Sequence, residues 1–111
     1  MSDTYKVVYS AAAQDDIRAI YTYIAYELDA KQTAHDQVDR IRSLVRKLNK
    51  MPERHSAVDW EPWASLDMRK VPVDNYVVFY LVDKTHKVVT VVRGFYGGSD
   101  IEEIMREVSV S

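Results

Sequence analysis

The chain has 111 residues, a length typical of one domain, which we take as residues 1–111. It contains no cysteine, which excludes disulfides and cysteine-ligated metal centres. Its 15 basic and 17 acidic residues give a net charge of −2, so any nucleic-acid role must come from a local patch. No signal peptide is readable, and the longest apolar run, 76–82, is too short for a membrane span. We therefore expect a cytoplasmic domain with no membrane partner.

The first half of the chain predicts one strand followed by two helices. Residues 5–9 are short and β-rich and predict the first strand. Ser10 then offers a hydroxyl cap for a helix over 11–28, where apolar residues are spaced by three and four. A second apolar stripe predicts a helix over 31–50, which ends before Pro52. The short connection between them predicts an antiparallel helix hairpin.

The second half of the chain is dominated by strands. Residues 51–66 show no periodicity and predict a connecting loop. Strands are predicted over three segments, 68–73, 76–82 and 88–93, and a closing helix over 100–108. Pro72 favours an edge position for its strand, whereas the doubly apolar strand 76–82 is predicted to be central. The fold class is therefore α+β, with an N-terminal strand and a helix hairpin packed on a small, twisted, mainly antiparallel sheet.

Two local features each allow two interpretations. Trp60 and Trp63 lie in the predicted loop, where they either anchor a partner or fix the loop to the core of the domain. The three glycines, Gly94, Gly97 and Gly98, all follow the last strand. They predict either a chain reversal into the final helix or a functional loop, since glycine lets another backbone or a ligand approach closely.

No metal-binding or nucleophile motif is present in the sequence. His35, His55 and His86 fall in a predicted helix, loop and turn without a paired spacing, which favours solvated or capping roles. The chain also lacks a glycine-rich phosphate-binding motif and a serine or cysteine nucleophile signature. The sequence therefore predicts neither a metal nor a cofactor.

Positive charge is concentrated at the end of the second predicted helix. Residues 40–54 contain six basic residues and one acidic residue, a local net charge of +5 in an acidic chain. Such a segment either attracts an acidic partner or a phosphate backbone, or forms the solvated face of an amphipathic helix.

Three further side chains are candidates for catalysis. Arg69 and Arg93 lie on predicted strands, and Tyr96 follows beside the glycines. An arginine can hold a phosphate by two parallel hydrogen bonds, and a tyrosine can stack on a base or bind a phosphoryl oxygen. We predict Arg69, Arg93 and Tyr96 as catalytic residues that converge on one concave sheet surface. Alternatively, the arginines pair with acidic residues of neighbouring elements and Tyr96 fills the core.

Short motifs follow one another in a fixed order along nearly the whole chain. They are Tyr9 to Ile17, the Ile20-Tyr-Thr-Tyr-Ile24 segment, Leu48-Asn-Lys-Met-Pro52, Met68 to Tyr80, and Val91 to Ile101. In this order and spacing they resemble the RelE/ParE superfamily of toxins from bacterial type II toxin–antitoxin modules. The fold of that superfamily, a small twisted antiparallel sheet under an N-terminal helix hairpin, agrees with the elements predicted above.

The resemblance implies a growth-inhibiting toxin that a cognate antitoxin neutralises with a helix and an extended segment. RelE-like and YoeB-like members cut mRNA on the ribosome, and ParE-like members inhibit DNA gyrase. The first activity would make the chain a metal-independent endoribonuclease, with His55 or Glu61 as the proton acceptor. The alternative is a non-toxic protein of the same fold that acts as an antitoxin-binding or regulatory partner.

Two positions depart from the pattern of the RNA-cutting members. Val77 stands where these members commonly carry an arginine, and Ser99 stands where many carry a basic residue. Arg93 is retained, and Tyr96 aligns with a C-terminal tyrosine of YoeB-like enzymes. Losing one transition-state cation costs on the order of 100-fold in rate, so the resemblance leaves enzymatic activity open.

Overall fold

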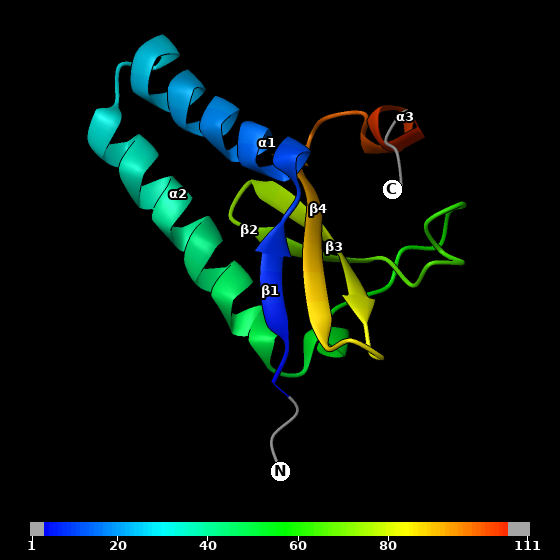
Figure 1. The fold of residues 1–111 in the computed structure, drawn as a ribbon. Coiled ribbons are helices and arrows are strands. Elements are labelled where there is room, and N and C mark those ends of the chain that lie inside the picture. The colour runs from blue at the N-terminus through cyan, green and yellow to red at the C-terminus, as the bar shows by residue number, and fades with distance from the viewer. Residues whose placement is uncertain (1–3, 107–111) are drawn as a thin grey trace.

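The N-terminal half of the chain forms a strand and a helix hairpin, as its apolar stripes predict (Figure 1). We describe residues 4–106 in a computed structural model of the chain. The first element is strand β1 (Lys6–Tyr9). Helix α1 (Ala11–Thr22) follows and continues as a π-helical turn (Tyr23–Glu27). Helix α2 (Lys31–Arg46) continues as a 3₁₀ turn (Lys47–Asn49). Ser10 caps α1, because its Oγ accepts a hydrogen bond of 3.0 Å from the Ala13 amide.

The C-terminal half supplies the rest of a four-stranded sheet. Its strands are β2 (Arg69–Val73), β3 (Tyr76–Asp83) and β4 (Val88–Tyr96), and the order across the sheet is β1-β4-β3-β2. β1 runs parallel to β4, and the other pairs are antiparallel. The predicted α+β class, the edge position of Pro72 and the central position of β3 are confirmed. β4 runs three residues beyond its predicted end, because it pairs with β3 as far as Tyr96.

A third helix, α3 (Ile101–Arg106), closes the described part of the chain. It confirms the predicted closing helix, whose last two residues, 107 and 108, lie outside the described range. Within residues 4–106, no helix is both long and apolar enough to cross a membrane.

The two faces of the sheet carry separate cores. On one face, α1 and α2 pack against side chains of β2, β3 and β4 such as Val71, Val78 and Val91. On the other face, the 56–68 segment and α3 cover a second cluster. That cluster contains Val58, Trp63, Met68, Phe79, Val92, Phe95 and Met105. The sheet is therefore covered on both faces, by the helix hairpin on one and by a loop and α3 on the other.

Trp63 fixes the long loop to the second core. Its side chain is fully buried, and its Nε1 donates a hydrogen bond of 3.3 Å to the Met105 carbonyl oxygen. Trp60 is half-buried and meets Phe79 edge-on, with ring centroids 6.2 Å apart. For Trp63, the structure confirms the core interpretation.

Gly97 and Gly98 follow β4 in the chain reversal that leads to α3, whereas Gly94 lies within β4. None of the three has a positive φ, so close packing explains Gly97 and Gly98 better than backbone conformation. The Gly97 amide donates to the Asn75 carbonyl oxygen at 2.7 Å. A Cβ at Gly98 would lie 2.5 Å from the ring of Tyr96, so glycine here makes room for that ring.

Candidate functional site

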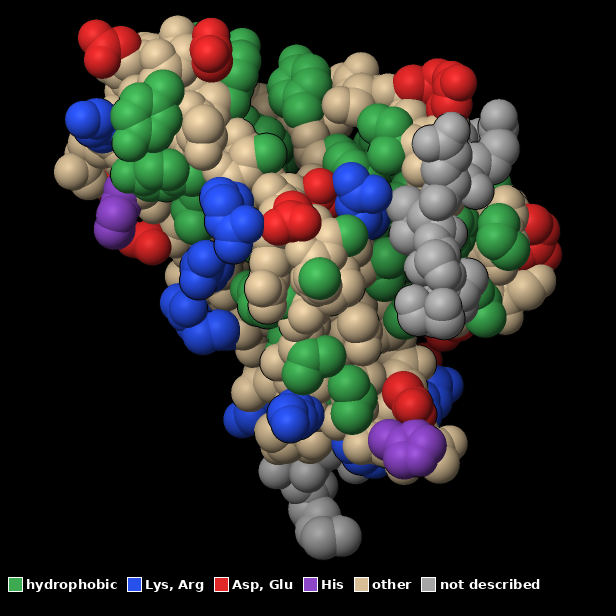
Figure 2. All heavy atoms as spheres, turned by 45° about the horizontal axis from the view of Figure 1, so that its top comes forward, with side chains coloured by type: hydrophobic (Ala, Val, Ile, Leu, Met, Phe, Trp, Pro, Cys, Tyr) green, Lys and Arg blue, Asp and Glu red, His purple; other side chains and the backbone are tan. Residues whose placement is uncertain are grey.

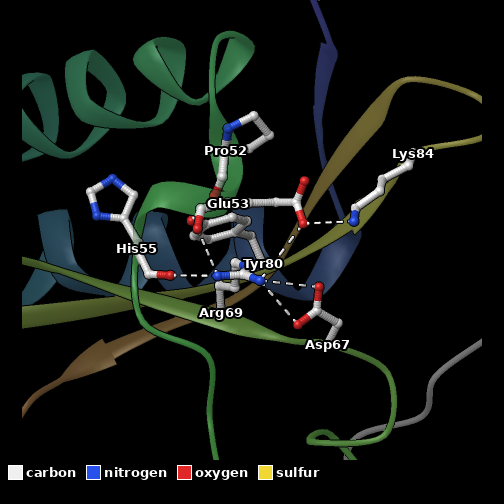
Figure 3. Close-up of polar contacts among 7 residues, drawn as sticks. All are labelled: Pro52, Glu53, His55, Asp67, Arg69, Tyr80 and Lys84. Atoms are coloured by element: carbon white, nitrogen blue, oxygen red, sulfur yellow. Dashed lines mark hydrogen bonds and ion pairs between the residues drawn. The ribbon is translucent and has the colours of Figure 1, made fainter.

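Arg69, at the start of β2, lies beneath the segment that follows α2 (Figure 3). Its Nη1 donates to the carbonyl oxygens of Glu53, at 2.7 Å, and His55, at 2.8 Å. Its Nη2 donates to both carboxylate oxygens of Asp67, at 3.2 and 3.3 Å. The Glu53 carboxylate lies 3.8 Å from Arg69 and pairs with Lys84 at 2.9 Å. Because the side chain is only 16% exposed, this guanidinium is a buried bridge between β2 and the 52–55 segment.

Tyr80 completes this network from β3. Its hydroxyl donates to the Pro52 carbonyl oxygen, and its ring meets the His55 imidazole edge-on. Burial raises the pKa of Tyr80 to about 12, against a weaker opposing effect from Arg69 and Arg54. The phenol is therefore a neutral hydrogen-bond donor that helps to hold the loop.

Arg93, on β4, joins the sheet to α1. Its Nε and Nη2 donate to the two carboxylate oxygens of Asp16, at 2.6 and 2.9 Å. The Gly94 amide adds a third bond to the same carboxylate, at 3.0 Å. The guanidinium also lies 4.6 Å from the ring centroid of Phe95. Only 22% of the Arg93 side chain and 13% of the Asp16 side chain are exposed, so the charge of this arginine is balanced inside the domain.

Tyr96, at the end of β4, lies on the surface. It is 57% exposed and packs edge-on against Tyr76, with ring centroids 6.2 Å apart. Together with Tyr23 and Leu28, these rings line a groove of about 610 Å³ beside α1. Burial raises the pKa of Tyr76, and the neighbouring phenols of Tyr23 and Tyr96 raise it further. The interpretation that Tyr96 fills the core is therefore wrong.

The structure does not bring Arg69, Arg93 and Tyr96 together. Arg69 pairs with Tyr80 of the helix-side core, and Arg93 pairs with Phe79 of the opposite core. Adjacent residues of a strand point to opposite faces, so the two arginines lie on opposite sides of the sheet. Tyr96 pairs at the level of Tyr76, four residues or roughly 13 Å along β3 from Tyr80. The predicted convergence on one surface is wrong, and the catalytic role of each residue stays a prediction.

A β-bulge in β4 is the physical reason for this difference. Tyr80 pairs with Val91, but Phe79 pairs with Arg93, so Val92 is an extra residue. Simple alternation from Val91, which faces the helices, would place Arg93 on the helix face, the same face as Arg69. The extra residue gives Arg93 the orientation of Phe79 and Phe95, and its guanidinium reaches Asp16 where β4 extends beyond its pairing with β1.

The two positions that depart from the RNA-cutting pattern line one cleft. Val77 and Ser99 border a cleft of about 760 Å³ on the face opposite the helix hairpin. Of the charged side chains described in its lining, Lys70 is the only cation, and Asp100 and Glu103 are acidic. A phosphorane in this cleft would face no arginine among the described residues.

The candidate proton acceptors lie outside this cleft. Burial and the nearby Arg54 lower the pKa of His55, whose backbone oxygen already binds Arg69. Hydrogen bonds from the Ser65 hydroxyl and amide lower the pKa of Glu61, which makes this carboxylate a weaker base. Neither residue lines the cleft that contains Val77 and Ser99. Within residues 4–106, no group of three or more His, Asp or Glu side chains is arranged to hold a metal ion.

Two features of the structure are missing from the sequence interpretation. The first is the role of Asp16, which the sequence places only near a helix start, where negative charge is favourable. The second is the groove formed by Tyr23, Tyr76 and Tyr96. A signal for it exists, because Tyr23 falls outside the apolar stripe of the helix predicted over 11–28 and is therefore an exposed aromatic residue.

A helix hairpin on a mainly antiparallel sheet places the chain in the α+β class of folds. Residues 7–95 match the family model described as the ParE toxin of the type II toxin–antitoxin system parDE. The chain belongs to this family of toxins within the RelE/ParE superfamily, which confirms the resemblance seen in the sequence. No match was found among curated proteins.

Solved toxin structures share this fold at low sequence identity. The chromosomal ParDE system of Pseudomonas aeruginosa matches with a TM-score of 0.69 and 18% identity, covering 86% of this chain and 98% of that one. The RelBE2 toxin–antitoxin complex of Mycobacterium tuberculosis matches with a TM-score of 0.62 and 16% identity, covering 84% of this chain and 91% of that one. A mutant of the Escherichia coli toxin RelE in the free state matches with a TM-score of 0.65 and 14% identity, covering 95% of this chain and 94% of that one.

Proposed function

We propose that this toxin inhibits growth by binding DNA gyrase through its surface, without cleaving RNA. The observation that carries the proposal is the cleft bordered by Val77 and Ser99, whose described lining contains one lysine and no arginine. RNA cleavage develops negative charge that needs nearby cations, and each missing donor costs about 10²–10³-fold in rate. Arg69 and Arg93 do not replace them, because acidic residues and backbone carbonyls already engage both guanidinium groups. Because gyrase is a cytoplasmic target, we expect the toxin to act in the cytoplasm.

The proposal is tested by two assays on the same purified toxin. A supercoiling assay with DNA gyrase should show inhibition that increases with toxin concentration. Primer extension on mRNA in a translating extract should show intact transcripts, since the ribosome is not the target. Cleaved transcripts together with unimpaired supercoiling would contradict the proposal and favour an mRNA-cutting enzyme.

We also propose that a cognate antitoxin neutralises the toxin by docking on the aromatic groove beside α1. The similar toxins of P. aeruginosa and M. tuberculosis belong to toxin–antitoxin systems, which supports such a partner. Tyr23, Leu28 and Tyr96 are each more than half exposed around this groove. Large aromatic side chains that converge on a groove are typical anchors for an amphipathic helix.

Removing two anchors should weaken this complex without unfolding the toxin. The double variant Tyr23→Ala/Tyr96→Ala should bind the antitoxin at least 10-fold more weakly in isothermal titration calorimetry. Tyr26→Ala is the matched control, because Tyr26 is 65% exposed but does not line the groove. Equal losses in both variants would contradict this location. A small adjacent reading frame with an acidic, helical C-terminal half would identify the antitoxin to test.

A further inference from the structure

A second groove lies on the other flank of α1, between α1, α2 and the end of β1. It encloses about 320 Å³. Its lining consists of Tyr9, Gln14, Ile17, Arg18, Tyr21, Val38 and Arg42. Two arginines, two phenols and one amide are therefore directed at one concave surface, and none of the lining residues is acidic.

The cations of this groove are not neutralised inside the domain. Within residues 4–106, no ion pair engages Arg42, Arg46 or Lys47, although Arg46 donates to the Ser43 hydroxyl at 3.0 Å. Arg18 contacts Asp15 at 3.0 Å, but both side chains are more than 70% exposed, so the pair is weak. Figure 2 shows basic side chains gathered in a column on the α2 side of the molecule.

The cations lie close together and extend the groove along α2. Arg42 and Arg46 are four residues apart on the same helix, a rise of about 6 Å. Both guanidinium groups act on the half-buried Tyr9 phenol, lowering its pKa against the stronger effect of burial. Both arginines therefore lie near Tyr9, at the β1 end of the groove, and extend the positive charge of the groove along α2.

The lining favours a phosphate backbone over an acidic protein. Protein partners need large apolar anchors, but the exposed large apolar side chains of residues 4–106 all lie outside this groove. Phosphate contacts instead come from arginine, lysine, tyrosine and glutamine side chains, the polar types present here. The charge of the groove and its polar donors match a polyanion.

We propose that this groove binds the sugar–phosphate backbone of duplex DNA without sequence preference, through Arg18, Arg42 and Arg46. The choice of duplex DNA rests on the proposed function, since a gyrase inhibitor meets its target with DNA bound. The groove and the Tyr96 groove lie on opposite flanks of α1, so the toxin can contact DNA while it presents its aromatic residues to another partner.

The test is fluorescence anisotropy of a labelled duplex DNA titrated with the purified toxin. Three phosphate contacts predict that the affinity of the wild type falls roughly 40-fold between 50 and 200 mM salt. In Arg42→Gln/Arg46→Gln, binding at low salt should weaken more than 10-fold, and the same salt step should cost only roughly 3-fold. The matched control is Lys31→Gln/Lys70→Gln, which removes the same charge from exposed positions outside the groove and should bind as the wild type does.

Any of the following outcomes would overturn the proposal. The first is absence of DNA binding by the wild type, or equal losses in the groove variant and the control. The second is tighter binding of single-stranded RNA of the same length, which would favour an RNA ligand. The third is displacement of the duplex by poly-glutamate as effectively as by unlabelled duplex, which would favour an acidic protein partner. Because the titration contains no gyrase, its result is independent of the supercoiling assay.

Discussion

Arginines of two regions of this molecule are used in opposite ways. In the sheet, Arg69 and Arg93 are largely buried, and each pairs with a carboxylate, Arg69 with Asp67 and Arg93 with Asp16. Arg69 also donates to two backbone carbonyl oxygens of the 52–55 segment. On α2, Arg42 and Arg46 are exposed, and no carboxylate within the described residues pairs with them. The side chain is the same, but the first pair holds elements together and the second pair is available to a ligand.

The comparison shows that a guanidinium must be judged by its partners and not by its position on a strand. The charge of a buried arginine that already pairs with a carboxylate is balanced inside the domain. An exposed arginine beside like charges keeps its donors and raises the local positive potential. Each of the following predictions tests one side of this contrast.

The largest loss of stability is expected when Asp16, the carboxylate that binds Arg93, is replaced. Asp16→Ala removes the acceptor of three hydrogen bonds and leaves the Arg93 guanidinium without its carboxylate. The free energy of unfolding should fall by about 3–4 kcal/mol, measured by urea denaturation. In a double-mutant cycle with Arg93→Ala, the coupling energy should exceed about 1.5 kcal/mol. If Arg93→Ala abolishes toxicity but leaves stability unchanged, Arg93 belongs to the functional surface and the contrast fails.

The buried phenol of Tyr80, next to Arg69, should make the protein less stable at alkaline pH. The pKa of this phenol is raised from 10 to about 12, so the folded state favours the neutral form. The stabilisation is complete below pH 10, where the phenol is neutral even in the unfolded chain, and is lost as the pH rises towards 12. The loss amounts to about 2–3 kcal/mol.

The slope of stability against pH isolates this effect from the other tyrosines. Tyr80→Phe also loses the hydrogen bond to the Pro52 carbonyl oxygen, so its stability is lower at every pH. Its free energy of unfolding should nevertheless decline less steeply above pH 10 than that of the wild type. Parallel declines in the two proteins would show that Tyr80 is not the group responsible.

A smaller loss is expected when the Arg69 guanidinium is removed. Arg69→Met keeps a long side chain but leaves the Glu53 and His55 carbonyl oxygens without their donor. The free energy of unfolding should fall by about 2 kcal/mol in urea denaturation. Lys70→Met, at the exposed neighbouring position of β2, is the matched control and should change little. Full stability combined with lost toxicity would indicate a functional role for Arg69 instead.

The elements of the fold could be predicted because each depends on local patterns. Apolar spacing of three and four defines α1 and α2, and runs of β-branched and aromatic residues define β2, β3 and β4. The resemblance to the toxin superfamily, and no local pattern, singled out Val77 and Ser99, which border one cleft in the structure.

The partners of the two sheet arginines could not be predicted in the same way. Asp16 and Arg93 are 77 residues apart, and their pairing depends on how α1 crosses β4. The bulge at Val92 reverses the face of Arg93, and no local pattern marks that extra residue. A one-residue change in register is enough to convert an expected shared site into two separate networks.

The smallest effect on stability is expected on α2. Arg42→Gln/Arg46→Gln removes two exposed cations that have no acidic partner in the described chain. The hydrogen bond that is lost, from Arg46 to the Ser43 hydroxyl, is exposed to solvent and contributes little. The like charges are also four residues apart on one helix face, where they repel each other weakly. The free energy of unfolding should therefore change by less than about 0.5 kcal/mol, with any change towards greater stability. A loss of 2 kcal/mol or more, as expected for Arg69→Met, would mean that the α2 arginines also hold the fold together, and the contrast between the two regions would disappear.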